Sequence, residues 1–349
     1  PHPIRPIRYL TLPVEAWTML QIRDFLESRE HLIFAVTSYY HPADRCLAFL
    51  RYYPAPQGER RRGGERFAKV ASTEASFSVL QSYPWYLFPS EVTGSLLQAV
   101  PMERIGRVYH PADMLAEIYE GPKDPLEERA LELSEFLSGI PREKKGVTGS
   151  LLVGLHDPRA SDIDFVVYGL KEHARAREAL RKGLEEGALR PPSREDWYRA
   201  YKKRFPRVET LTFEEFLWYE GRKYHKGIVG GAIFDILLVR EPWEIEGRYS
   251  ERRFKRGEET KLRCLVTDAS LAFDSPAVYK VEGEVEEVVS FTHTYAGKAL
   301  VGEEIEVSGR LEEVQEAGKS YMRVVVGTTR EAEGEYIKVI KKRGEGSED

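Results

Sequence analysis

Two neighbouring stretches of the chain carry residue types suited to binding phosphate and metal. Gly149-Ser150 forms an expected turn, and Asp162 and Asp164 follow in the sequence Ser161-Asp162-Ile163-Asp164. Glycine lets backbone N–H groups approach an anion closely, and serine adds a hydroxyl donor. Side chains alternate between the two faces of a strand, so Asp162 and Asp164 point the same way. Two carboxylates on one edge of a buried strand need a cation, and the pattern therefore predicts a phosphate-binding turn beside a metal site.

A later apolar run contains a third acid. Asp235 interrupts the otherwise apolar sequence of residues 232–239. The run that follows Asp164 is also apolar, which is typical of a strand buried on both faces. Acids that enter such strands need partners, so we expect Asp235 to lie beside the first two acids.

In type and spacing these residues resemble the signature of the nucleotidyltransferase superfamily related to DNA polymerase beta. The elements follow in the family's order, Gly149-Ser150, then Asp162-Ile163-Asp164, then Phe234-Asp235-Ile236, and the resemblance covers residues 119–250. The whole chain also resembles uncharacterised archaeal proteins described as predicted nucleotidyltransferases.

The resemblance implies a site for two Mg²⁺ ions, or Mn²⁺, about 3.5–4 Å apart. Asp162 and Asp164 bind both ions, and Asp235 is a ligand of the ion that activates the attacking hydroxyl. Gly149 and Ser150 hold the β- and γ-phosphates of a nucleoside triphosphate. The implied reaction transfers a nucleoside monophosphate to a hydroxyl acceptor and releases pyrophosphate. We expect a nucleic-acid acceptor, with RNA favoured. The alternatives are a protein or small-molecule acceptor, or an inactive nucleic-acid-binding protein.

One basic segment opposes the overall charge of the chain. The net charge is −5, but residues 190–226 hold ten Lys/Arg against six Asp/Glu, which gives +4 there and −9 elsewhere. The aromatic residues of this segment either stack on a nucleotide strand or face a core. Arg222, Lys223 and Lys226 directly precede the Asp235 strand, and one of these cations is expected to reach the triphosphate.

A second basic run, Arg60-Arg61-Arg62, lies in an expected connection over residues 54–65. It is either a solvated, mobile loop or a finger that contacts the phosphates of a nucleic acid. His156 and Asp157 are expected in a surface turn, because Asp157-Pro158 suits turn chemistry.

Length and pattern predict a multidomain α/β and β protein, because 349 residues exceed a single comfortable core. We expect an N-terminal α+β domain at 1–118, a polymerase-beta-like catalytic domain at 119–256, a small OB-like β-barrel domain at 257–343 and a disordered tail at 344–349. The chain has two cysteines and no apolar run long enough to cross a membrane, so we expect free buried thiols and a cytoplasmic protein.

Local patterns predict individual elements within these domains. Asp124 is expected to cap a helix, with Pro125 as its first residue and Glu127 as the capping-box partner. Expected helices span 13–30, 125–138, 171–187, 193–204 and 212–221. Expected strands span 32–37, 46–53, 66–71, 262–266, 278–281, 285–289, 304–311, 321–326 and 336–340.

Overall fold

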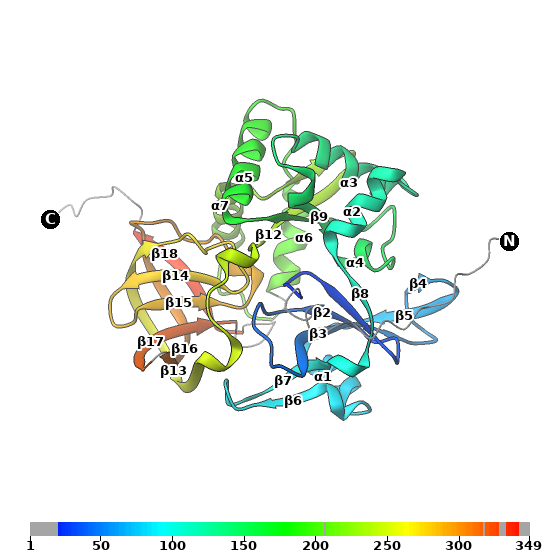
Figure 1. Ribbon diagram of the computed structural model, residues 1–349. Coiled ribbons are helices and arrows are strands. Elements are labelled where there is room, and N and C mark those ends of the chain that lie inside the picture. The colour runs from blue at the N-terminus through cyan, green and yellow to red at the C-terminus, as the bar shows by residue number, and fades with distance from the viewer. Residues whose placement is uncertain (1–19, 206, 317, 328–332, 342–349) are drawn as a thin grey trace.

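The computed structural model describes residues 20–205, 207–316, 318–327 and 333–341. The protein is a mixed α/β structure that is mostly β, with three sheets that meet near the middle of the molecule (Figure 1). None of the helices in these ranges is both long and apolar enough to cross a membrane. The expected tail at 344–349 lies outside the described residues.

The first sheet is built from the N-terminal part of the chain. Its strand order is β4-β5-β3-β2-β1-β8, with β7 paired to β3 and β6 paired to β7. The strands are β1 (Phe25–Ser28), β2 (Ile33–Val36), β3 (Arg45–Pro54), β4 (Arg60–Arg62), β5 (Glu65–Lys69), β6 (Leu87–Ser90), β7 (Ser95–Pro101) and β8 (Ile105–Tyr109), with helix α1 (Thr73–Leu80) between β5 and β6. The strands expected at 32–37, 46–53 and 66–71 are therefore confirmed as β2, β3 and β5.

The helix expected at 13–30 is wrong where the structure describes it, from Leu20 onward. Those residues form a turn and then strand β1, whose four residues are all buried. β1 pairs with β2 on one side and β8 on the other, so strand pairing in the sheet overrides the local helical pattern. Residues 1–19 lie outside the described ranges.

The second sheet, in the middle of the chain, carries the predicted acids. Its order is β11-β12-β10-β9, with β10 and β12 parallel and the other pairs antiparallel. The strands are β9 (Lys145–Thr148), β10 (Ile163–Tyr168), β11 (Lys226–Val229) and β12 (Ala232–Val239). Helices α2 (Pro111–Glu120), α3 (Pro125–Phe136) and α5 (Leu170–Glu185) pack against one face, and α4 (Gly149–Leu152) follows β9.

Helix α3 begins as predicted, with one difference. Asp124 Oδ1 accepts hydrogen bonds from the backbone N–H groups of Leu126 and Glu127 at 2.8 and 3.1 Å. The Glu127 carboxylate accepts from the N–H of Lys123 at 2.7 Å, one residue before the capping residue. The cap is therefore confirmed, while the reciprocal bond falls one position earlier than in a capping box.

The third sheet closes on itself at the C-terminal end of the chain. Its neighbours run β13-β14-β15-β17-β16, β13 also pairs with β16, and β18 lies beside β16. The strands are β13 (Arg252–Asp268), β14 (Ala277–Glu282), β15 (Glu287–Ser290), β16 (Glu304–Glu316), β17 (Lys319–Val326) and β18 (Tyr336–Lys341). Each of the six expected C-terminal strands corresponds to one of these.

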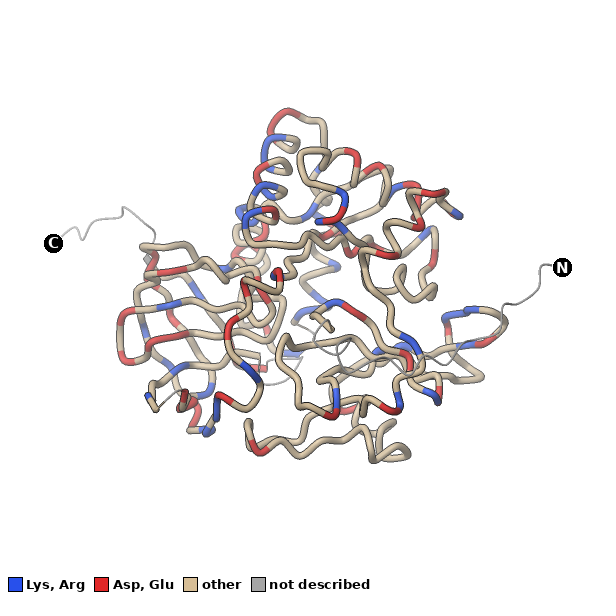
Figure 2. The backbone as a smooth tube through the Cα atoms, in the orientation of Figure 1, with Lys and Arg blue, Asp and Glu red and all other residues tan. Residues whose placement is uncertain are grey.

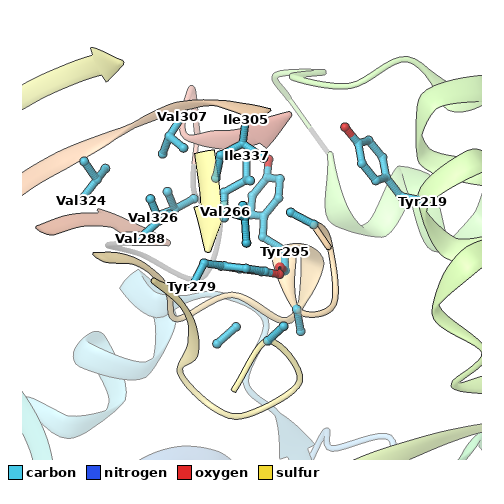
Figure 3. Close-up of a cluster of buried hydrophobic side chains, with 14 of the residues drawn as sticks. Tyr219, Val266, Tyr279, Val288, Tyr295, Ile305, Val307, Val324, Val326 and Ile337 are labelled. Carbon is cyan, nitrogen blue, oxygen red and sulfur yellow. Dashed lines mark hydrogen bonds between the residues drawn. The ribbon is translucent and has the colours of Figure 1, made fainter. Parts of the chain in front are cut away.

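Helices α6 (Arg194–Arg204) and α7 (Phe213–Lys223) pack onto this third sheet. The side chains of Tyr201, Phe205, Phe216 and Tyr219 share one core with the sheet's apolar side chains, and Figure 3 labels Tyr219 together with apolar residues of the sheet. The core-facing interpretation is therefore confirmed for these four aromatics, whereas Tyr198 and Trp218 are exposed. The expected boundary at 118/119 falls within α2, and that at 256/257 falls within β13.

Candidate metal and phosphate site

Two of the three predicted acids lie side by side at the same level of the central sheet. Asp164 on β10 is in register with Asp235 on the parallel strand β12 and with Thr148 on β9. Ile163 and Phe165 point into the core beneath the helices, so Asp164 points to the opposite face. Asp162 lies just before β10 and is exposed. The structure thus brings Asp164 and Asp235 together and leaves Asp162 at the solvent edge.

The surroundings of Asp164 disfavour its ionised form. Burial raises its pKa, and the negative charge of Asp235 raises it further, against the opposing charges of Lys226 and Arg23. Burial also opposes ionisation of Asp235, but Lys226, His225 and His293 hold the pKa of Asp235 well below its ordinary range. Lys226 and the two histidines therefore favour the ionised form of Asp235, whereas a further cation beside Asp164 would favour the ionised form of that acid.

The two oxygens of Asp235 have different surroundings. Oδ2 accepts hydrogen bonds from Lys226 Nζ and lies 3.2 Å from His293 Nε2. Oδ1 is buried and has no hydrogen-bond partner among the described residues. A buried carboxylate oxygen without a partner is energetically costly, and a bound cation would remove that cost.

Gly149 brings the predicted turn against Asp164. It follows β9 directly and has a φ of +70°, which favours glycine. A Cβ at this position would lie 2.1 Å from Asp164 Oδ2, so no larger residue fits without displacing that carboxylate. Ser150 is half-buried in the first turn of α4. The glycine therefore makes the close approach between the turn and the acid possible.

The three cations expected near the triphosphate are placed differently. Lys226 lies opposite Asp235 on β11 and is ion-paired with it. Arg222 is bound to Glu303 at 2.6 Å, and Lys223 is buried against Glu220 at 2.6 Å. Of the three, the structure brings Lys226 to the acids and directs the other two toward the third sheet.

The Arg60–Arg62 run forms strand β4, which pairs with β5 as a hairpin. The three arginines are therefore part of a sheet, and their side chains have different surroundings. Arg60 Nη1 lies 3.5 Å from the hydroxyl of Ser161, next to Asp162. Arg62 is ion-paired with Glu27 at 2.7 Å. Arg61 is exposed, so it is the member of the run whose side chain faces solvent.

Two residues that the sequence patterns did not single out lie beside the acids. His293, in the short 3-10 helix η7 (His293–Tyr295) between β15 and β16, contacts Asp235, and its side chain is 38% exposed. Arg23, in the turn before β1, has a φ of +76°, and its carbonyl accepts a hydrogen bond from Thr148 Oγ1 at 2.6 Å. No motif could have identified them, because each comes from a different sheet.

A second, oppositely charged cluster lies next to the acids, around the buried Glu220 on α7. Lys223 Nζ, His225 Nε2 and Arg204 Nη1 lie 2.6, 3.6 and 3.7 Å from its carboxylate. Burial opposes ionisation of Glu220, but Lys223, Arg204 and His225 hold its pKa far below the ordinary range. His225 Nε2 is also 3.8 Å from Asp235 Oδ1, so it connects this cluster to the acids.

A separate group of possible metal ligands lies at the start of α3. Ligand atoms of Asp124, Glu127 and His156 lie within 4.8 Å of one another, and His156 Nε2 is 2.7 Å from Asp124 Oδ2. Such a group could hold a metal, although Asp124 and Glu127 already cap the helix. The residues after His156 form the expected turn, in which Ser161 N–H donates to the carbonyl of Asp157. Among the described residues, the acids of the central sheet do not form a group of three whose ligand atoms all lie within 4.8 Å of one another.

Comparison with known proteins gives one close match. The chain is 43% identical over 338 residues to "Uncharacterized protein MJ1086" of Methanocaldococcus jannaschii, which covers 92% of this chain and 99% of that protein. No protein-family model matches the chain. No solved structure matches it either.

Proposed function

The chain belongs to one family with the uncharacterised protein MJ1086 of Methanocaldococcus jannaschii, and we propose that it is a divalent-metal-dependent nucleotidyltransferase. In the proposed reaction the oxygen of an acceptor hydroxyl attacks the α-phosphorus of a nucleoside triphosphate. The bond from that phosphorus to the bridging oxygen breaks, pyrophosphate leaves, and the hydroxyl proton passes to solvent.

One observation carries this proposal. Asp164 and Asp235 are in register on adjacent parallel strands, and Gly149 packs its backbone against the Asp164 carboxylate. A ligand held by the turn would therefore lie beside both acids. Nucleotidyl transfer needs a phosphate-binding turn beside acids that would hold a cation, because the cation would offset the charge that develops on the phosphate.

The acids fit a hard divalent cation. Asp235 Oδ1 is buried without a hydrogen-bond partner, and burial together with Asp235 raises the pKa of Asp164. Both facts favour binding of positive charge at this place, and oxygen ligands suit Mg²⁺ and Mn²⁺. When bound, the metal would supply Lewis-acid stabilisation of the charge that develops on the phosphate oxygens.

The neighbouring side chains orient the acids. Lys226 and His293 hold Asp235 Oδ2, while Oδ1 has no hydrogen-bond partner among the described residues and so remains free to accept a cation. Asp162 lies two residues before Asp164 on the same side of the chain, and we expect its exposed carboxylate to turn toward the pair when a cation binds. Gly149 and Ser150 supply donors to the β- and γ-phosphates.

The arrangement of the sheets supports the same proposal. We take the central sheet, β11-β12-β10-β9 with its acids on the face away from α3 and α5, as polymerase-beta-like. We take the closed ring β13-β14-β15-β17-β16, with β15 and β17 parallel, as an OB-like barrel. OB folds are often used to bind single-stranded nucleic acid, which favours RNA as the acceptor.

The hairpin β4–β5 offers a further basic surface for that acceptor. A shallow hollow at its tip is lined by Arg61, Arg62, Gly63, Gly64 and Arg66. Arg61 and Arg66 are exposed, as arginines that contact a phosphate backbone would be. Figure 2 shows the Lys and Arg colouring along this hairpin. Three of the seven aromatic side chains of α6 and α7 give no such support, because Tyr201, Phe216 and Tyr219 are buried in the core of the third sheet. Tyr198 and Trp218 are exposed.

The test is incorporation of label from each α-³²P-labelled nucleoside triphosphate, with Mg²⁺ or Mn²⁺, into RNA, DNA or protein. We expect label in RNA and release of pyrophosphate, and we expect Asp164→Asn to abolish both. Glu135→Gln, which changes an exposed carboxylate on α3, is the matched control and should keep full activity.

The other outcomes identify the alternatives. Label in protein or in a small molecule would replace RNA as the acceptor. Nucleotide binding without any incorporation would favour the inactive binding protein, and unchanged activity of Asp164→Asn would remove the acids from the mechanism.

A further inference from the structure

The turn that contains Arg23 is locked onto the candidate phosphate site. The Arg23 carbonyl accepts a hydrogen bond from Thr148 Oγ1 at 2.6 Å, and Thr148 is the residue directly before Gly149. The Arg23 N–H donates to the carbonyl of Val36 on β2 at 3.4 Å. The N-terminal sheet therefore carries this residue to the end of β9, on the face of the central sheet where Asp164 lies.

The backbone of Arg23 is strained at this point. Its φ of +76° lies in the left-handed region, which is unfavourable for a side chain of this size. Strain of this kind is energetically costly and persists where the surrounding structure imposes it, often at ligand sites. Glycine would relieve that cost, so the arginine side chain itself calls for an explanation.

The side chain lies near the acids but leaves a donor unused. Its Nε is buried and has no hydrogen-bond partner among the described residues. Burial dominates the pKa values of Asp164 and His293, yet the charge of Arg23 lowers both of them, so the guanidinium is close to each. A guanidinium has five N–H donors in a planar fork that matches phosphate oxygens, and an unused buried donor is costly.

We propose that Arg23 binds the β- and γ-phosphates of the nucleoside triphosphate, opposite the metal-binding acids. The inference rests on the proposed nucleotidyl transfer and assigns part of the nucleotide site to the N-terminal sheet. A triphosphate held between the Gly149 turn and Arg23 would give the unpaired Nε an acceptor. Its negative charge would also be shared between the arginine and the cation at Asp164.

The test is the affinity for non-hydrolysable α,β-methylene nucleoside triphosphates in the presence of Mn²⁺, measured by calorimetry and compared with the corresponding monophosphates. Arg23→Gly keeps the backbone bond from Thr148 and adopts the positive φ freely, so its thermal midpoint should equal or exceed that of the unmodified protein. We expect it to weaken triphosphate binding by about 10–100-fold and to leave monophosphate binding unchanged.

Two further variants complete the experiment. Arg23→Lys keeps the charge but not the planar fork, so it should give a smaller loss of triphosphate affinity. Arg29→Ala changes an exposed arginine of the same segment and should give no loss. Equal triphosphate affinity of Arg23→Gly and the unmodified protein, or a parallel loss of monophosphate affinity, would overturn the proposal.

Failure of the proposed function is distinguishable from failure of this inference. If the unmodified protein binds the triphosphate through Arg23 but transfers no nucleotide, the proposed enzymatic activity is wrong and the proposed role of Arg23 stands. If the unmodified protein transfers nucleotide and Arg23→Gly binds triphosphate normally, the proposed activity stands and the proposed role of Arg23 is wrong. Absence of triphosphate binding by the unmodified protein would overturn both.

Discussion

Asp164 and Glu220 are acids whose surroundings shift their pKa values in opposite directions. Glu220 is one buried acid among Lys223, Arg204 and His225, and its pKa is far below the ordinary range as a result. Asp164 lies beside a second acid, Asp235, and its pKa is raised, because burial and the charge of Asp235 outweigh Lys226 and Arg23. A single acid held among cations suits a role in the fold, whereas two acids side by side next to a glycine turn are suited to a ligand.

The largest expected effect comes from removing the charge of Glu220. Glu220→Gln would leave the buried Lys223 and the half-buried Arg204 without a counter-charge, so we expect a loss of about 3–5 kcal/mol in the free energy of unfolding. Denaturation in urea measures it. Glu214→Gln removes a carboxylate that is 70% exposed and ion-paired with Arg194, and it should cost no more than about 1 kcal/mol. Similar losses in the two variants would contradict a structural role for Glu220.

Asp164→Asn should affect activity more than folding. We expect nucleotide transfer to fall by at least about 10²–10³-fold, because a carboxylate that stabilises the developing charge is lost. The rate of label incorporation under saturating triphosphate measures this effect. A variant that loses activity because it is unfolded would contradict the contrast with Glu220.

The raised pKa of Asp164 gives this variant an opposite effect on stability. Its folded pKa lies above the unfolded value, so ionisation costs stability at neutral pH, and the cost disappears as the pH falls through the folded pKa. Without divalent cations, Asp164→Asn should therefore unfold at a higher temperature than the unmodified protein at pH 7. Mg²⁺ should stabilise the unmodified protein and not the variant. Thermal unfolding with and without MgCl₂ checks both statements.

Gly149→Ala separates backbone strain from contact with the acid. Both Gly149 and Gly187 have positive φ, at +70° and +77°, but a Cβ meets Asp164 Oδ2 at 2.1 Å in the first case and no atom within 4 Å in the second. Strain in either variant should cost about 1–3 kcal/mol of stability. Only Gly149→Ala should also weaken Mn²⁺ binding, because it displaces the Asp164 carboxylate. Equal Mn²⁺ affinities in the two variants would separate the turn from the metal site.

A last prediction concerns His41, which is partly buried and has no acid beside it among the described residues. Its ring accepts from the N–H of Leu47 and contacts the carbonyl of Leu20, and burial lowers its pKa to about 4. Between pH 6.5 and 4 the unfolded chain binds a proton that the folded chain does not, so stability falls by up to about 1.4 kcal/mol per pH unit. Urea midpoints of His41→Gln should fall less steeply with pH than those of the unmodified protein. Parallel pH profiles would contradict this account.

The sequence predicted the parts of the site that depend on local pattern. Apolar strands interrupted by acids indicated that Asp235 would lie beside Asp164, and the register of β10 and β12 confirms this adjacency. The turn at Gly149 was predicted from glycine chemistry, and its positive φ agrees. Asp162 was expected in the strand but is exposed just before it, because the pairing of β10 starts at Ile163.

The remaining parts depend on contacts between segments distant in the chain. Arg23 and His293 reach the acids through packing of the first and third sheets, and no periodicity marks either residue. The aromatics of α6 and α7 satisfied two patterns equally, stacking surface and core. Burial of Tyr201 and Phe216 against the third sheet decides between them. Strand pairing likewise prevailed over helical pattern at Phe25–Ser28.

The packing of α6 and α7 on the third sheet affects how the protein can be divided. A fragment that ends at residue 256 would cut β13 and leave buried aromatics such as Phe216 facing water. Exposed apolar surface of that kind promotes aggregation, so a shortened protein for biochemical work needs both helices together with the complete C-terminal ring. Because β11 follows α7 directly and pairs with β12, removal of the ring would also disturb the strands that carry Lys226 and Asp235.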